Sequence, residues 1–184
     1  NYGSANVKGN TEIVISRDVS VINTQGGGQV GIFGGGVARN YGTAGVNGNT
    51  NITIAGGTLD DISVYGGGLA YMGNTRAYAY VSGDATITIQ GAVGLKAIAM
   101  TRSLNGGGLN AGDNTSTADV KGTKSLVFDN TGSGSVSAGI ADFDVIIFKG
   151  ISWLTFTKAL SSDVKSVKAE GEFANGTVIL TLVK

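Results

Sequence analysis

The residues of this sequence best suited to catalysis are two pairs of aspartates, and only one of the pairs can share a face. Asp60 and Asp61 are adjacent, so on a strand their side chains point to opposite faces. Asp142 and Asp144 flank Phe143 and share one face if the segment is extended. The 184 residues include no histidine and no cysteine, so the usual general base and transition-metal ligands are missing. We therefore expect solvated carboxylates and no enzymatic activity.

Metal and nucleotide binding are not indicated either. Calcium needs several oxygen ligands close together, and the sequence contains neither the helix-loop calcium pattern nor the Gly-Gly-x-Gly-x-Asp repeat. The glycine triplets at 26–28, 34–36, 66–68 and 106–108 lack the Lys-(Ser/Thr) ending of a phosphate-binding loop. We expect no metal and no cofactor.

Tyrosines are the candidate binding residues. Tyr78 and Tyr80 are two residues apart and therefore point to the same face of a strand, whereas Val81 points to the opposite face. Both tyrosines thus face solvent if Val81 faces a core. Exposed tyrosines stack on sugar rings or contact a protein surface, and the alternative is that they only cover apolar surface and lateral loops. The candidates in the repeated part of the chain are Tyr65, Tyr71, Tyr78 and Tyr80.

The composition narrows the class of protein. The 13 basic and 13 acidic residues balance, which gives no reason to expect a nucleic-acid partner. No apolar run is long enough to span a bilayer. Glycine supplies 32 residues and proline none, while 41% of the chain is hydrophobic, too much for a disordered glycine-rich tract. Polarity that comes from Asn, Thr, Ser and Gly suits an extracellular protein.

An internal repeat organises the sequence. The pattern A-x-V-x-G-x-x-x-I-x-I occurs at 5–15, 44–54 and 79–89. A less exact copy at 118–128 has Leu and Phe in place of the two isoleucines. Its marker glycines, Gly9, Gly48, Gly83 and Gly122, are 39, 35 and 39 residues apart. A second block, (V/I)-(F/Y)-G-G-G, lies between the copies at 32–36 and 64–68, with a weaker match ending at Gly108.

These repeats predict strands that stack as a β-solenoid. The apolar positions alternate with period two, and Val, Ile, Thr and Tyr favour strands. One repeat has too few apolar side chains to fold alone, whereas stacked repeats bury them in columns, with Ile13, Ile52 and Ile87 in one core. We expect an all-β, right-handed parallel β-helix, because parallel crossovers favour that hand. Each repeat is either one coil with a long loop or two ordinary coils.

The glycines predict corners. Gly-(Asn/Asp) between the two short strands supplies residues that tolerate positive φ, and the triplets indicate sharp corners or close approach of adjacent coils. Glycine is less frequent after residue 122. We expect repeats over 1–122 and, over 123–184, an irregular capping segment or shorter coils of the same solenoid, with a strand run over 140–148 and a hairpin turn at Asn175-Gly176.

The alternating V-x-G-(N/D)-x-x-I-x-I and (V/I)-(F/Y)-G-G-G blocks resemble the β-helical passenger regions of bacterial autotransporters and related surface adhesins. The segment 139–148, followed by Trp153-Leu154-Thr155-Phe156, is similar to coils near the end of such passengers. The resemblance implies surface display, an extracellular or cell-surface location and adhesion. No signal peptide is visible at Asn1, and because the chain starts inside a repeat we expect an excised fragment.

Three functions remain open at this stage. The first is a structural or adhesive module, a rigid stalk that presents a binding surface to a host or cell-surface glycan or protein. The second is a carbohydrate-binding or polysaccharide-degrading module with a groove lined by tyrosines and carboxylates. The third is a self-assembling extracellular fibre, which requires end-to-end association through matching strand edges.

Overall fold

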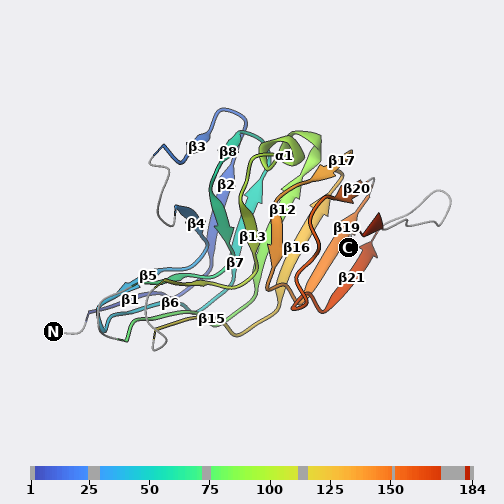
Figure 1. Ribbon diagram of the computed structural model, residues 1–184. Helices are drawn as coiled ribbons and strands as arrows, with labels where there is room; N and C mark the ends of the chain where they lie inside the picture. Colours follow the sequence, from blue (N-terminus) through green and yellow to red (C-terminus); the bar gives the residue numbers. More distant parts are fainter. Residues whose placement is uncertain are drawn as a thin grey trace.

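The chain folds as a parallel β-solenoid, which confirms the predicted fold class. The computed structural model describes residues 3–24, 30–71, 76–111, 116–150, 152–170 and 181–182. Within them, successive passes of the chain lie side by side and pair in parallel along the molecule (Figure 1). One short helix interrupts the strands.

The strands form six sheets, each built from equivalent segments of successive coils. The longest sheet contains β2 (Thr11–Ile15), β7 (Thr50–Ile54), β12 (Ala85–Gln90), β16 (Lys124–Asp129), β19 (Val145–Lys149) and β21 (Ser166–Glu170). A second contains β4 (Gly31–Phe33), β9 (Ser63–Tyr65), β13 (Ser103–Asn105) and β18 (Gly139–Ala141). The third and fourth are β3 (Ser20–Ile22) with β8 (Thr58–Asp60), and β17 (Gly132–Val136) with β20 (Ser152–Phe156) and β22 (Thr181–Leu182). These four sheets are called the body.

The remaining two sheets form a thin projection, the arm, which extends to the lower left of the body in Figure 1. One contains β1 (Ser4–Val7), β6 (Thr43–Val46), β11 (Tyr78–Val81) and β15 (Thr117–Val120). The other contains β5 (Val37–Arg39), β10 (Leu69–Tyr71) and β14 (Leu109–Ala111).

The predicted column of aliphatic residues is present in the body. Ile13 pairs in register with Ile52, and Ile52 with Ile87. The column continues through Leu126 and Ile146, and the four residues from Ile52 to Ile146 are at most 1% exposed. Full burial of each such side chain contributes about 1.5–3 kcal/mol relative to exposure. The column therefore stabilises each inner coil through the coils on both sides of it.

Each early repeat is one coil, and the arm accounts for its length. Residues that stack on one another lie 39, 35 and 39 positions apart in the first coils. The chain runs out along the arm on β5 and returns on β6, through a turn in which Gly42 N–H donates to Arg39 O and Asn40 and Tyr41 have positive φ. Of the two arrangements left open by the repeat length, one coil with a long lateral extension is the one observed.

The arm has a core made almost entirely of alanine. Its two sheets pack through Ala38, Ala44, Ala70, Ala77 and Ala79, with Ala118 against them. Because a methyl group is the whole side chain, the two sheets lie close together and leave no interior volume to fill. The alternation that buries these alanines turns their neighbours outward, so each arm sheet has one outer face.

The last three glycine triplets are the corners where the chain leaves the body for the arm, here called the triplet joint. Gly35 N–H donates to Gly67 O at 3.0 Å, and Gly67 N–H to Gly107 O at 3.0 Å. A Cβ on Gly67 would lie 2.6 Å from the backbone nitrogen of Gly108. The predicted close approach of adjacent coils is therefore confirmed.

The Gly-(Asn/Asp) pairs are the corners where the chain returns to the body, here called the ladder joint. Asn49 N–H donates to Asn10 Oδ1 at 2.8 Å, and Asp84 N–H to Asn49 Oδ1 at 2.9 Å. Thr123 N–H donates to Asp84 Oδ1 at 2.8 Å. Each coil therefore caps a backbone amide of the next coil with a side-chain oxygen.

The side-chain oxygens of the ladder joint explain why glycine precedes each Asn or Asp there. The sequence prediction had given positive φ as the reason. Gly48, Gly83 and Gly122 do not have positive φ, so the explanation from positive φ was wrong. A Cβ at Gly48 would instead lie 2.2 Å from Asn10 Oδ1, and one at Gly83 would lie 2.1 Å from Asn49 Oδ1. Glycine is needed because the ladder oxygen of the preceding coil fills that space.

Replacing Asn49 by alanine should lower the free energy of unfolding by about 0.5–1.5 kcal/mol, because the exposed Asp84 amide loses its side-chain acceptor and must bond to water instead. Urea unfolding followed by circular dichroism measures the loss. Asp84→Asn is the matched control, since it keeps an acceptor oxygen at the ladder position. Equal losses in the two variants would show that the ladder bond contributes nothing.

The last coils are shorter because they have no arm. Stacked residues there lie 20 and 21 positions apart. β18 joins β19 through Asp142, Phe143 and Asp144, with Asp142 at φ 56°. The predicted strand run over 140–148 is therefore present as two strands, β18 and β19, which this turn separates. Phe143 is fully buried at the place where the arm leaves the earlier coils.

Two further features complete the fold. Helix α1 (Gly91–Ala97), which the repeat pattern did not predict, takes the place in the third coil that β3 and β8 hold in the first two. The predicted hairpin turn at Asn175-Gly176 lies outside the described residues. The described part of the chain has no helix with the length and hydropathy needed to cross a membrane.

Candidate binding surface

The four candidate tyrosines do not form one row; the fold distributes them over three places. Tyr78 and Tyr80 flank the buried Ala79 and lie on the outer face of one arm sheet. Tyr71 follows the buried Ala70 and lies on the outer face of the opposite arm sheet. Tyr65 belongs to β9 in the body. The expectation that Tyr78 and Tyr80 point away from the core is confirmed, although both are half-buried.

Tyr80 is held flat across the arm by contacts with three other coils. Its ring lies where a Cβ of Gly45 would be, and its hydroxyl donates to Asn47 Oδ1 at 3.1 Å and Asn6 Oδ1 at 3.4 Å. Lys121 Nζ lies 5.6 Å from the ring centroid, within the range of a cation–π contact. The ring is therefore fixed before any ligand arrives.

Tyr78 extends this surface. Its ring stacks on that of Tyr80 with centroids 5.4 Å apart and an interplanar angle of 25°. We call the set Tyr78, Tyr80, Asn6, Asn47 and Lys121 the tyrosine face. It combines aromatic area with amide groups that donate and accept hydrogen bonds and with one cation.

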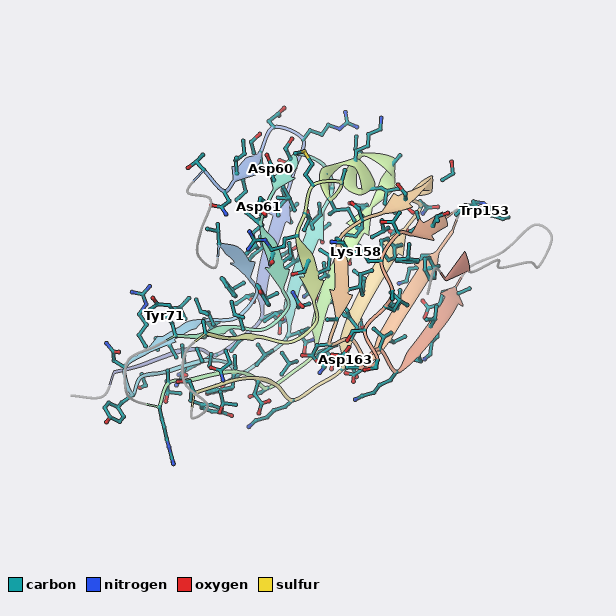
Figure 2. All side chains as sticks on the ribbon, viewed as in Figure 1. Asp60, Asp61, Tyr71, Trp153, Lys158 and Asp163 are labelled. Atoms are coloured by element: carbon teal, nitrogen blue, oxygen red, sulfur yellow. The ribbon has the colours of Figure 1, made fainter. Side chains whose placement is uncertain are left out.

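The other two tyrosines have single partners. Arg39 lies over the Tyr71 ring at 5.1 Å, and the Tyr71 side chain is 42% exposed on the arm (Figure 2). Tyr65 stacks on Phe33 at 5.0 Å with an interplanar angle of 7°. Neither site gathers the mixture of groups found on the tyrosine face.

Sequence reasoning missed Asn6, Asn47 and Lys121 as members of the surface. The repeat contained part of the signal, because Asn6, Gly45 and Tyr80 occupy the same position in three copies and pair in register. A tyrosine beside a glycine on a neighbouring strand has room to lie across it. The side-chain contacts themselves depend on rotamers, which the repeat does not specify.

Three of the four aspartates that were considered as catalytic groups, Asp61, Asp142 and Asp144, form ion pairs. Asp61 accepts a bidentate hydrogen bond from Arg102, with Nη2 at 2.9 Å from each carboxylate oxygen. Asp142 pairs with Lys124, and Asp144 with Lys165 at 2.5 Å. Asp142 and Asp144 thus lie in one cluster of alternating charge, and each carboxylate already has a cation.

The Lys165 ammonium, which donates to the Asp144 carboxylate, lowers the pKa of Asp144 below its ordinary value of 3.8, with the Lys124 amide and charge acting in the same direction. The pKa of Asp163 is also lowered, mainly by the hydrogen bond from the Asp142 backbone. A carboxyl group whose folded pKa is depressed stabilises the folded state fully above its unfolded pKa. That contribution disappears as pH falls through the lower folded value.

We therefore expect the protein to lose stability as pH is lowered from about 4 toward 2. Lys165→Ala should make that decrease smaller, because Asp144 then titrates closer to its unfolded pKa. Thermal unfolding at a series of pH values measures the difference. Lys158→Ala removes an exposed lysine nearby in sequence and should leave the pH profile unchanged; an equal effect of both substitutions would refute the pairing.

Among the described residues no three acidic side chains come together in a group that could hold a metal ion. The comparisons with known proteins add no assignment. No family model matches the chain, no curated protein matches it, and no solved structure matches its fold. The arm and its tyrosine face are the structural features that bear on function.

Proposed function

We propose that this chain is a structural and adhesive module of a bacterial cell-surface or secreted protein, in which the solenoid body is a rigid support and the arm presents a binding surface. The observation that carries the proposal is the tyrosine face, a preorganised aromatic and amide surface on a projection that the stacking of the body does not require. The resemblance to autotransporter passengers and surface adhesins supports an extracellular location.

The arm is the feature that needs a functional explanation. The later coils, with stacking distances of 20 and 21 residues, show that the solenoid closes its core without an arm. The arm therefore adds ordered residues, at about 1–2 kcal/mol of backbone entropy each, around a core of alanines that bury little apolar area. Presentation of a surface away from the body accounts for this cost.

A glycan is the ligand class that fits the tyrosine face. Sugar rings combine apolar C–H faces with hydroxyl groups, which match the stacked rings of Tyr78 and Tyr80 and the amides of Asn6 and Asn47. Rigid aromatic side chains give contact area with little loss of conformational entropy. One carboxylate, that of Asp119, pairs in register with Tyr80. The polysaccharide-degrading alternative needs a second carboxylate opposite the first, and Asp61, Asp142 and Asp144 are held in ion pairs elsewhere.

The test is an array of immobilised glycans probed with the full chain. We expect binding to a subset of glycans, and we expect the double variant Tyr78→Ala/Tyr80→Ala to weaken that binding about 10-fold or more, as loss of central aromatic contacts does. Tyr80→Phe keeps the ring and removes only the hydroxyl bonds, so its effect should be smaller.

Tyr71→Ala is the matched control, since Tyr71 is an arm tyrosine on the opposite face. It should leave glycan binding unchanged. Thermal unfolding of all variants separates loss of binding from loss of the arm. Unaltered binding by the folded double variant, or no binding of the unmodified chain to any glycan on the array, would refute the proposed ligand class.

A further inference from the structure

The first coil, made of β1 to β5, has a surface that the other coils do not expose. Val7 is 45% exposed, whereas its register partners Val46 and Val81 are 1% and 0% exposed. Ile13 and Ile32 are also only partly buried, although Ile52 and Val64 at the same positions of the second coil are at most 1% exposed. The first coil thus presents one side of the solenoid core.

Backbone amides are left open at the same place. In the next three coils, the three amides of the ladder joint all donate to the preceding coil; in the second coil these are Asn47 to Val7 O at 2.9 Å, Gly48 to Gly9 O at 3.2 Å, and Asn49 to Asn10 Oδ1. Within the described residues, the equivalent amides of Lys8, Gly9 and Asn10 donate to no protein group.

Gly9 is a second, independent feature that indicates a further coil on this surface. Gly48, Gly83 and Gly122 are glycines because the ladder oxygen of the preceding coil lies 2.1–2.4 Å from where their Cβ would be. Among the residues that the structure describes, nothing lies within 4 Å of the corresponding position at Gly9. Nor does Gly9 have a positive φ. The contacts of this chain therefore give no reason for a glycine there, whereas an incoming ladder oxygen would.

We propose that the first coil is a docking surface for a further coil of the same repeat, presented by the end of another solenoid segment that carries V-x-G-(Asn/Asp). That coil would place its Asn or Asp oxygen on Gly9, accept hydrogen bonds from the three amides at 8–10, and cover Val7. The interface is continuous with the three ladder-joint interfaces already present, and it goes beyond the proposed glycan binding because it involves a different surface.

A second copy of this chain does not provide the required partner. Its last ladder position is Thr123, which carries no amide or carboxylate oxygen to continue the ladder. β19 already covers β16, and the outermost strand β21 carries Lys168 and Glu170, charges typical of an edge that resists pairing. The two ends of the described solenoid therefore do not match, which also argues against the self-assembling fibre.

The experiment adds one repeat to the full chain. Residues 40–74 are duplicated ahead of Asn1. This continues the repeat in register because Ser4 and Tyr78 both pair with Thr43, and each is the fourth residue after the added segment or after residue 74, respectively. Amide hydrogen exchange at Lys8, Gly9 and Asn10 should be fast in the unmodified chain. In the extended chain we expect exchange to slow by on the order of 100-fold.

Two substitutions make the test specific. Gly9→Ala should leave the Tm of the unmodified chain unchanged but lower that of the extended chain by about 3–10 °C, since the new Cβ would then meet the added ladder oxygen. Replacing the ladder asparagine of the added repeat with alanine should restore fast exchange at Asn10 alone.

Three results would overturn the proposal. The first is protection of these amides in the unmodified chain together with a dimeric mass by light scattering, which would mean that a second copy covers the surface. The second is the same effect of Gly9→Ala in both chains. The third is failure of the extended chain to fold, because its added joint and ladder duplicate ones that the solenoid already contains.

Discussion

Replacing Phe143 by alanine is expected to lower the free energy of unfolding by about 3–5 kcal/mol, the range for a fully buried phenylalanine. Phe143 is 0% exposed and belongs to the body core. Its ring lies against Gly106, at the mouth through which the arm joins the body in the earlier coils. Truncation therefore leaves a cavity and also opens the core at the first armless coil.

Urea unfolding monitored by far-ultraviolet circular dichroism measures this loss. Phe143→Leu should cost less than half as much, because most of the volume is kept. Trp153→Ala is the control, since Trp153 is larger than Phe143 but 54% exposed on β20, at the far end of the molecule from the arm (Figure 2). Similar losses for Phe143→Ala and Trp153→Ala would mean that Phe143 does not seal the core.

Gly67→Ala is expected to have the second-largest effect, a loss of about 1–3 kcal/mol or more. The new Cβ would lie 2.6–2.9 Å from the backbone of Gly107 and Gly108 in the next coil. Backbone atoms in the middle of a stack cannot move without shifting the neighbouring coil. The gain of about 0.4–1 kcal/mol from restricting the unfolded chain offsets only part of this cost.

Gly139→Ala is the matched control, because its Cβ would meet only ordinary contacts at 3.7 Å and its φ is not positive. This substitution should be neutral or slightly stabilising in the same unfolding experiment. A neutral Gly67→Ala variant would show that the triplet joint has more room than the stacked backbones indicate. The pair thus separates close approach from the general effect of removing a glycine.

The stacking of the body could be predicted from sequence because it rests on a repeated pattern of large aliphatic residues. Ile13, Ile52 and Ile87 pair in register as the repeat requires. The arm could not be predicted in the same way, although its signal was present. Alanine recurs at 5, 44, 79 and 118, but a small residue at an inward position is compatible with a core, a surface or a loop.

Local backbone conformation, such as the turn at Asp142, could not be predicted from the apolar pattern. The apolar residues over 140–148 predict a strand run, yet Asp142 adopts positive φ and turns the chain, which places Phe143 in the core. Only part of the candidate binding surface could be predicted from the sequence. Parity placed Tyr78 and Tyr80 outside the core, whereas their contacts with Asn6, Asn47 and Lys121 arise from neighbouring coils whose alignment needs the fold.

The two joints at the base of the arm also determine how the module responds to tension. The hydrogen bonds of the triplet joint, such as Gly35 N–H to Gly67 O, run from coil to coil, across the direction in which the arm projects. A pull outward along the arm therefore loads the bonds of all arm-bearing coils in shear at the same moment. Bonds that share a force in this way withstand more than bonds that are unzipped in turn.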